Sequence, residues 1–222
     1  MKPIVIWYHC LFQLEDRIVP EAVEIVSEQM RALTQSGLVD IASEIVVGVN
    51  GGEESRIYVE SMIPEKASVI YHGLQCKNEC RTMTELGEWA QSNPDAYVLY
   101  LHAKGAAHPS PLNNRWRNCM MQACVWRWRH CVDLLDHGHD AVGAHWVDWQ
   151  MMGLPQRYFA GTFFWATSRF LKTLPSIQDS ARVRISGIDS PESRYEAEVW
   201  IGTGPKLPRI VDLARHRFMS CP

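Results

Sequence analysis

Short apolar runs that alternate with helical segments constrain this chain more than any other feature of its sequence. Residues 4–8 are apolar and partly β-branched, which predicts a buried strand. Residues 20–33 follow with apolar side chains at helical spacing, with Pro20 in the first turn and Gly37 beyond the end. The alternation continues with expected strands at 44–49, 67–71 and 97–102 and expected helices at 53–62 and 82–91.

This order of elements predicts a mostly parallel central sheet with helices on both faces, which is a single Rossmann-like α/β/α sandwich. We expect residues 1–222 to form one domain, because 222 residues with 46% hydrophobic content suffice for one core and are few for two. Ligands of such sheets bind beyond the carboxyl ends of the strands. The positions to inspect are therefore residues 9–10, 50–52, 72–73 and 102–105.

The second half of the chain has a less regular pattern. It predicts a long helix at 115–135, a strand at 141–145 and a strand-to-turn segment at 159–166. Two short helices are expected at 168–174 and 193–201. A loop is expected at 176–193 and a further short helix after Pro205.

Charge and cysteine content narrow the classes of function. The formal net charge is −3, so the protein is not built to bind nucleic acid over its whole surface, although a local basic pocket could hold a small phosphorylated ligand. No apolar stretch approaches the roughly 20 residues of a membrane span, and no secretory signal is visible. Seven irregularly spaced cysteines then predict reduced thiols and a cytoplasmic protein.

The end of the strand expected at 97–102 carries the strongest candidate residues. His102, Lys104 and Gly105 follow one another there, and His9 ends the first expected strand. Lysine neutralises phosphate as a point charge, histidine exchanges protons, and glycine permits a tight turn or a close backbone approach. The alternative is a hydrogen-bonded strand end followed by a solvated loop lysine.

Arg115 and Arg117 lie near the expected start of the long helix. Helix N-termini attract anions, and two guanidinium groups strengthen that attraction. The equally plain interpretation is a capping segment with one arginine that reaches out to solvent.

Residues 158–166 are aromatic and contain one glycine, which is typical of a wall that binds a sugar ring. Gly161, Thr162 and Trp165 are the pocket candidates, whereas Phe163 and Phe164 are expected in the core.

Glu196 and Glu198 are two residues apart on an expected helix, so they face different directions. We choose Glu198 as a general base for a hydroxyl. The alternative is a charged surface helix.

Histidines and acids also gather at residues 137–148, where imidazole and carboxylate could ligate a divalent ion. The same stretch reads as a polar turn between a helix and a strand, and we prefer that interpretation.

Several short motifs, taken in their order, resemble an uncharacterised, glycosyltransferase-like bacterial family. YLHAKG at 100–105 is similar to its YLHxKG segment, and a tryptophan-containing helix follows at 115–120. GTFFWA at 161–166 is similar to a GNFWWA segment, and residues 194–202 are similar to an RxxxExWIG helix. The resemblance is clearest after Tyr97.

The resemblance implies a fold like that of the GT-A nucleotide-sugar transferases and a hexosyltransferase-like activity with a nucleotide sugar and a hydroxyl acceptor. It implies a nucleotide-binding half at 1–105 and an acceptor-side half at 106–222. GT-A folds usually carry an Asp-x-Asp motif that binds a metal such as Mn, and no Asp-x-Asp occurs here. Threonine also stands at 162 where the family has asparagine. The assigned roles are Glu198 as catalytic base; His9, His102, Lys104, Gly105, Arg115 and Arg117 for the donor; and Gly161, Thr162, Trp165, Arg194 and Trp200 for the acceptor.

Three hypotheses follow from the sequence. The first is sugar transfer from a nucleotide donor to a hydroxyl. The second is a non-catalytic module on the same fold that binds a glycan or a protein, which the missing acidic pair favours. The third is a metal-dependent hydrolase that uses residues 137–148.

Overall fold

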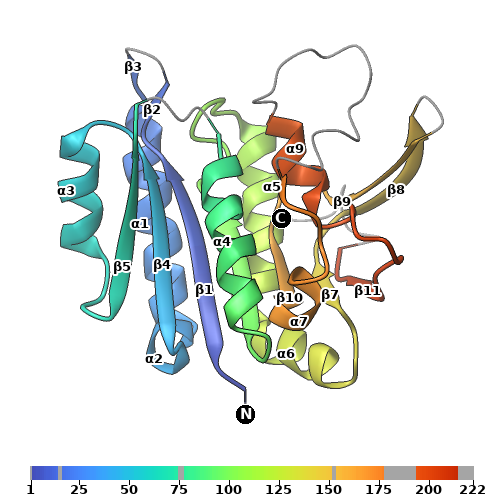
Figure 1. The fold of residues 1–222 in the computed structure, drawn as a ribbon. Coiled ribbons are helices and arrows are strands. Elements are labelled where there is room, and N and C mark those ends of the chain that lie inside the picture. The colour runs from blue at the N-terminus through green and yellow to red at the C-terminus, as the bar shows by residue number, and fades with distance from the viewer. Residues whose placement is uncertain (1, 15–16, 75–77, 152–153, 178–193, 215–222) are drawn as a thin grey trace.

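The computed structural model describes residues 2–14, 17–74, 78–151, 154–177 and 194–214. The central sheet consists of β1 (Ile4–Leu11), β4 (Glu44–Asn50), β5 (Ala67–Gly73), β6 (Tyr97–His102), β7 (Ala141–Gly143), β10 (Phe164–Thr167) and β11 (Ile210–Asp212). These seven strands lie in the order β11-β7-β10-β6-β1-β4-β5 (Figure 1). All neighbours are parallel except β10, which is antiparallel to both β6 and β7.

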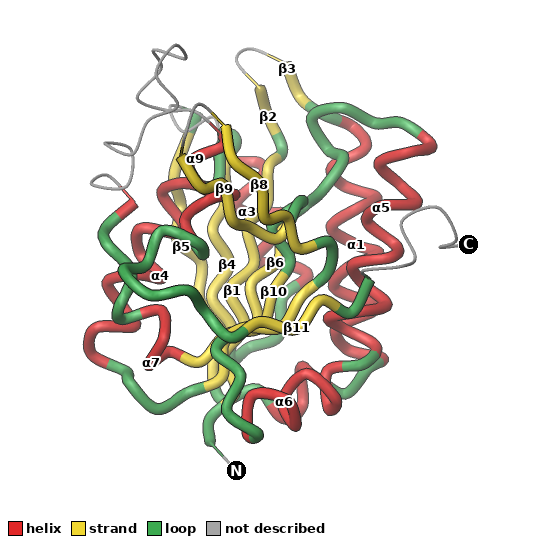
Figure 2. The backbone as a smooth tube through the Cα atoms, turned by 90° about the vertical axis from the view of Figure 1, so that its right-hand side faces the viewer, coloured by secondary structure: helices red, strands yellow, loops and turns green. Residues whose placement is uncertain are grey.

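Helices cover both faces of this sheet (Figure 2). One layer holds α1 (Pro20–Gln35), α5 (Pro111–Met121), the π-helical turn η1 (Gln122–Trp126) and α6 (Trp128–Asp136). The other layer holds α4 (Cys80–Ser92), α7 (Ser168–Leu171) and α9 (Arg194–Trp200). The short helix α2 (Leu38–Ile41) follows α1, and α3 (Glu53–Met62) joins β4 to β5.

The alternation of side chains along the strands decides which residues face the site. In β1, Ile6 and Tyr8 pack into the core with α1, whereas Trp7 packs into the core with α4. His9 follows with the same parity as Trp7, and it is paired in register with His102 of β6. Both histidines therefore face the α4 side at the carboxyl ends of adjacent strands.

Two small hairpins lie at this same edge of the sheet (Figure 1). One pairs β2 (Gln13–Leu14) with β3 (Arg17–Ile18), and the other pairs β8 (Trp146–Met151) with β9 (Leu154–Phe159). The turn between β9 and β10 delivers residues 160–163 to the carboxyl edge, because β10 runs opposite to its neighbours.

The mostly parallel sheet with helices on both faces confirms the fold predicted from the sequence. Three local predictions are wrong. The long helix begins at Pro111 rather than at 115, since the Ser110 hydroxyl accepts from the Asn113 backbone N–H and Pro111 suits the first turn. Residues 159–166 contain the end of β9, a turn and β10. Within residues 206–214, the short helix expected after Pro205 is replaced by β11, which pairs with β7; residues 215–222 lie outside the described residues.

Cysteine chemistry also departs from the prediction at one position. Cys10, Cys124 and Cys131 are buried free thiols, but Cys119 is disulfide-bonded, so the expectation of reduced thiols throughout is wrong. No helix in the described ranges combines the length and the apolar character needed to cross a bilayer.

Candidate functional site

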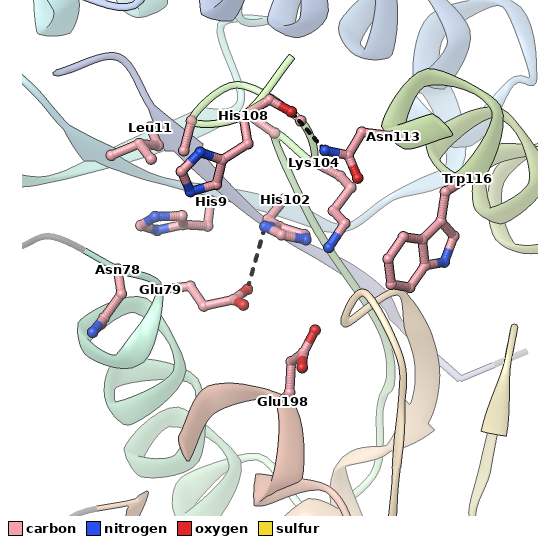
Figure 3. A pocket seen from close by; sticks show the side chains of 13 residues that line it. His9, Leu11, Asn78, Glu79, His102, Lys104, His108, Asn113, Trp116 and Glu198 are labelled. Carbon is pink, nitrogen blue, oxygen red and sulfur yellow. Dashed lines mark hydrogen bonds and ion pairs between the residues drawn. The ribbon is translucent and has the colours of Figure 1, made fainter. Parts of the chain in front are cut away.

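A cavity of about 460 Å³ lies at the carboxyl ends of β1 and β6. Figure 3 shows its side chains converging from the sheet, from the start of α4, from α5 and from α9. This is the place where ligands of such sheets bind. The side chains that bring polar groups or an indole to the lining are His9, Asn78, Glu79, His102, Lys104, His108, Asn113, Trp116 and Glu198.

His102 ends β6 and faces the cavity as a neutral imidazole. Its Nε2 lies 2.9 Å from the Gly161 carbonyl oxygen, and Nε2 must carry the proton because a carbonyl only accepts. Burial lowers the pKa of His102 to about 3, and the positive charge of Lys104 adds to this effect. The other ring nitrogen, Nδ1, therefore presents a lone pair, and it lies 3.7 Å from Oε2 of Glu79.

Glu79 immediately precedes α4 and is a buried carboxyl group, only 7% exposed. Its Oε2 accepts from the Tyr100 hydroxyl at 2.9 Å, and its Oε1 accepts from the Thr162 hydroxyl at 3.2 Å. Burial raises the pKa of Glu79 to about 7, against the lowering effects of Tyr100, Lys104 and Thr162. Since His102 is neutral, the contact between Glu79 and His102 is not an ion pair at neutral pH.

Gly161 joins the two sides of the cavity through its backbone. Its carbonyl accepts from His102, and its N–H donates to Oε1 of Glu198 at 3.1 Å. The residue has a φ of +87°, and a Cβ there would lie 2.7 Å from Sδ of Met120. Both the backbone conformation and the available space therefore favour glycine.

Glu198 comes from α9 and is half-buried. Figure 3 shows its carboxylate pointing into the cavity, toward the side that carries His102 and Glu79. The hydrogen bond from Gly161 fixes one oxygen, so the other oxygen can face a ligand.

Lys104 follows β6 and is held against α5. Its Nζ lies 4.2 Å from the ring centroid of Trp116, which is a cation–π contact. Among the described residues that line the cavity, Lys104 is the only lysine or arginine. The indole thus places the cationic group of the site at the cavity wall.

His9 and His72 are buried histidines that contact the same hydroxyl group, that of Thr82. Nδ1 of His9 lies 2.8 Å from Oγ1 of Thr82, and the same hydroxyl lies 2.8 Å from Nε2 of His72. Burial is the main cause that lowers the pKa of both histidines, to about 4 for His72. Gly48 leaves room for this arrangement, because a Cβ there would lie 2.1 Å from the Thr82 hydroxyl.

Of the remaining predicted donor residues, Gly105 lines the cavity and the two arginines do not. Arg115 is exposed and outside the lining. Arg117 is buried, donates to the Lys104 carbonyl oxygen and pairs with Glu28 at 3.1 Å. Because α5 begins at Pro111, both arginines lie beyond its first turn, and Arg117 supports the loop of Lys104.

The predicted acceptor residues are mostly in the core. Thr162 is buried and directed at Glu79. Trp165 and Trp200 are buried and donate from Nε1 to the carbonyl oxygens of Cys124 and Pro175. Neither indole lines the cavity. Arg194 begins α9, and its side chain lies outside the described residues.

Sequence reasoning missed Glu79 and Trp116. Glu79 lies in a segment without periodicity, and its hydrogen-bond partners Tyr100 and Thr162 are distant in the sequence. One signal was available, because the rule that ligands bind after parallel strands points to the segment that follows β5. The sequence places Trp116 on the long helix without indicating that its indole lines the cavity.

The histidine- and acid-rich stretch at 137–148 forms no metal centre that the structure describes. His137 contacts Asp133, and Asp148 pairs with Arg157 at 3.2 Å. Within the described ranges, no group of three or more His, Cys, Asp or Glu side chains is placed to hold a metal ion. These residues therefore provide no ligand set for a divalent ion such as Mn.

Solved structures with a similar fold show low similarity to this chain. Crystal structures of 4-diphosphocytidyl-2C-methyl-D-erythritol synthase (11% identity, TM-score 0.43, 99% of this chain and 92% of that chain) and of HddC from Yersinia pseudotuberculosis (8%, 0.48, 96% and 90%) are two of them. A third is Rv0371c from Mycobacterium tuberculosis H37Rv (10%, 0.44, 84% and 84%). Identities and TM-scores this low carry no conclusion about the activity of this chain.

A search among curated proteins found no match to the sequence. A protein family does match, over residues 7–184, which include His102, Glu79 and Gly161 and end before α9. Because the match extends over more than half of the chain, the protein belongs to the family described as a domain of unknown function (DUF8361).

Proposed function

We propose that the protein is a transferase that moves a sugar from a nucleotide-sugar donor to a hydroxyl acceptor in this cavity. One observation carries the proposal. A carboxylate, Glu198, and an ammonium group, Lys104, line the same cavity at the carboxyl edge of a mostly parallel sheet. A base and a cation placed together in this way suit a reaction in which a hydroxyl loses a proton and a phosphate leaves.

The proposed roles follow from the side-chain chemistry. Glu198 takes the proton of the acceptor hydroxyl, and the acceptor oxygen forms a bond to the anomeric carbon of the sugar. The bond between that carbon and the donor diphosphate breaks, and its electron pair goes to the diphosphate. Lys104 stabilises the charge that develops there, and Trp116 keeps the ammonium group in position.

The two parts of the chain contribute different groups to this reaction. His9, His102 and Lys104 come from residues 1–105, which we assign to the donor. Glu198 and the turn at Gly161 come from residues 106–222, which we assign to the acceptor. The described polar groups of the cavity therefore belong to one continuous site with two sides.

The first test is a thermal shift series with nucleoside diphosphates and nucleotide sugars, with and without manganese. A ligand that binds only the folded protein raises the melting temperature by mass action. We expect a shift with one nucleoside diphosphate that Lys104→Met abolishes. No shift with any nucleotide at millimolar concentration would overturn the donor assignment.

Glu198→Gln then separates binding from chemistry. The variant should keep the thermal shift and lose about 10²–10⁴-fold in transfer rate, because a general base contributes that much. Glu196→Gln is the matched control, since Glu196 lies on the same helix and does not line the cavity. Equal losses in the two variants would assign Glu198 a structural role.

A binding module on the same fold is the second candidate, favoured by the missing Asp-x-Asp motif and by an indole on the cavity wall. In that case Glu198→Ala would leave glycan binding unchanged, and no nucleotide would shift the melting temperature.

A further inference from the structure

The contact between Glu79 and His102 requires a proton that neither group holds in its ordinary neutral-pH state. Nε2 of His102 donates to the Gly161 carbonyl, so a neutral imidazole has a bare lone pair on Nδ1. That nitrogen lies 3.7 Å from Oε2 of Glu79. If Glu79 were ionised, two lone pairs would face each other in a buried place. One proton between them turns this repulsion into an attraction.

The neighbours of Glu79 do not supply that proton. The hydroxyls of Tyr100 and Thr162 each donate one hydrogen to the carboxyl group, and each of them stays covalently on its own oxygen. Lys104 is the only lysine or arginine among the described lining residues, and it acts on Glu79 through its positive charge, which lowers the pKa of that carboxyl group. The extra proton therefore belongs to the pair of Glu79 and His102.

We infer that Glu79 and His102 share one proton at the cavity wall, and that Glu79 delivers it, as general acid, to the oxygen of the leaving group. This role rests on the proposed transfer reaction and adds to it a proton donor paired with the base Glu198. Glu79 lines the cavity and is the catalytic residue, whereas His102 is a positioning residue. Two carboxyl groups of one cavity thus have opposite roles, which their environments set.

The completed step balances. The acceptor hydroxyl gives its proton to Glu198, its oxygen bonds to the anomeric carbon, and the bond from that carbon to the phosphate oxygen breaks. The electron pair stays on the phosphate oxygen, which receives the proton of Glu79. Glu79 ends ionised and Glu198 ends protonated, and exchange with solvent after product release restores both.

The proton on Glu79 also matters for the net charge that a phosphorylated donor meets. With both glutamates ionised, their two negative charges outnumber the one positive charge of Lys104. With Glu79 protonated, Glu198 and Lys104 balance. The titratable and charged groups that face this pair are Tyr100 and Lys104 from β6 and its following loop, Glu198 from α9 and His9 from β1.

The shared proton can be measured without any activity. Carbon-13 NMR of the glutamate side-chain carboxyl groups, with the Glu79 signal assigned by its loss in Glu79→Gln, should show a titration midpoint near pH 7. Nitrogen-15 spectra should show His102 with its proton on Nε2. A Glu79 midpoint below pH 5 would overturn the inference.

The acid role is tested with two donors in the same enzyme. Glu79→Gln should lose about 10²–10⁴-fold in kcat with a nucleotide sugar, and much less with a glycosyl fluoride, whose leaving group needs little protonation. It should also remove the fall of the wild-type rate above pH 7. Glu88→Gln, an exposed glutamate on the same helix, is the control. Equal losses with both donors would overturn the acid role.

The two tests separate the failure of this inference from that of the proposed function. If the wild-type protein transfers sugar while Glu79 titrates below pH 5, the shared proton is wrong and the transferase stands. If Glu79 titrates near pH 7 but no donor reacts, the transferase and the acid role both fail, and the shared proton stands.

Discussion

The two walls of the cavity hold the same kind of side chain in different environments. On the sheet wall, which consists of the ends of β1 and β6 and the start of α4, Glu79 is buried and contacts Tyr100, Thr162 and His102. On the α9 wall, Glu198 is half-buried and accepts one backbone hydrogen bond. The comparison teaches that the surroundings of a carboxyl group, rather than its residue type, set its properties: burial raises the pKa of Glu79. Substitutions on the sheet wall should therefore alter the pKa of Glu79. Substitutions on the α9 wall should alter the position of the Glu198 carboxylate.

The largest expected effect is a pH-dependent gain of stability in Glu79→Gln. The pKa of folded Glu79 is about 7, above its ordinary value of 4.5, so between these values the folded protein binds more protons than the unfolded one. Wild-type stability therefore falls as the pH rises from 4.5 through 7. The free-energy difference between Glu79→Gln and wild type should grow by an amount on the order of 3 kcal/mol over that window.

Urea unfolding at several pH values measures this difference, and comparing it with wild type cancels the contributions of groups that do not contact Glu79, such as His72. Glu88→Gln is again the matched control. A pH-independent difference between Glu79→Gln and wild type would mean that burial does not raise the pKa of Glu79.

The next largest effect is expected at Gly161, whose backbone links the two walls through hydrogen bonds to His102 and Glu198. Gly161→Ala places a Cβ at positive φ and against Met120, whereas Gly37→Ala has a φ of +80° with nothing within 4 Å of the added Cβ. Both variants should lose about 1–2 kcal/mol for the backbone conformation. Gly161→Ala should lose about 1–2 kcal/mol more, because the added carbon overpacks the turn.

Thermal unfolding gives the stabilities, and a nucleotide or glycan titration gives the effect on the site. Only Gly161→Ala should weaken binding, since it moves both His102 and Glu198. Equal behaviour of the two alanine variants would argue against Gly161 as the link.

The smallest effect should come from Tyr100→Phe. It removes one donor to the Glu79 carboxylate, which raises the pKa of Glu79 further. The lost hydrogen bond costs about 1 kcal/mol of stability. Tyr8→Phe is the control, because its hydroxyl is equally buried but donates to Gln29 on the other face of the sheet. An unchanged Glu79 midpoint in Tyr100→Phe would remove Tyr100 from the acid site.

The sequence predicts the first part of the fold well, because there each element shows its own local pattern. The bounds expected for β6 and α3 agree with the structure, and β1 extends three residues beyond its expected end. The alternation of strands and helices also identified the carboxyl edge as the place for a ligand.

The second part could not be read from local patterns. β11 is only three residues long and is defined by its pairing with β7. The burial of Trp165 and Trp200, which looked like pocket residues, depends on Cys124, Pro175 and the core around them. Glu79 illustrates the same limit, since burial raises its pKa, and the partners that hold it in its buried place lie 21 and 83 positions away in the sequence.

The position of β10 has a consequence for the order of folding. β10 lies between β6 and β7 and pairs with a strand more than sixty residues earlier, so its turn reaches the cavity only after long-range pairing is complete. Glu198 arrives later still on the ribosome. Such distant pairings form slowly. A chain that has released only its first hundred residues can hold most of the strands from β1 to β6 but not a complete cavity. Ligand binding would therefore report that synthesis has passed Glu198 and that the long-range pairing of β10 has formed.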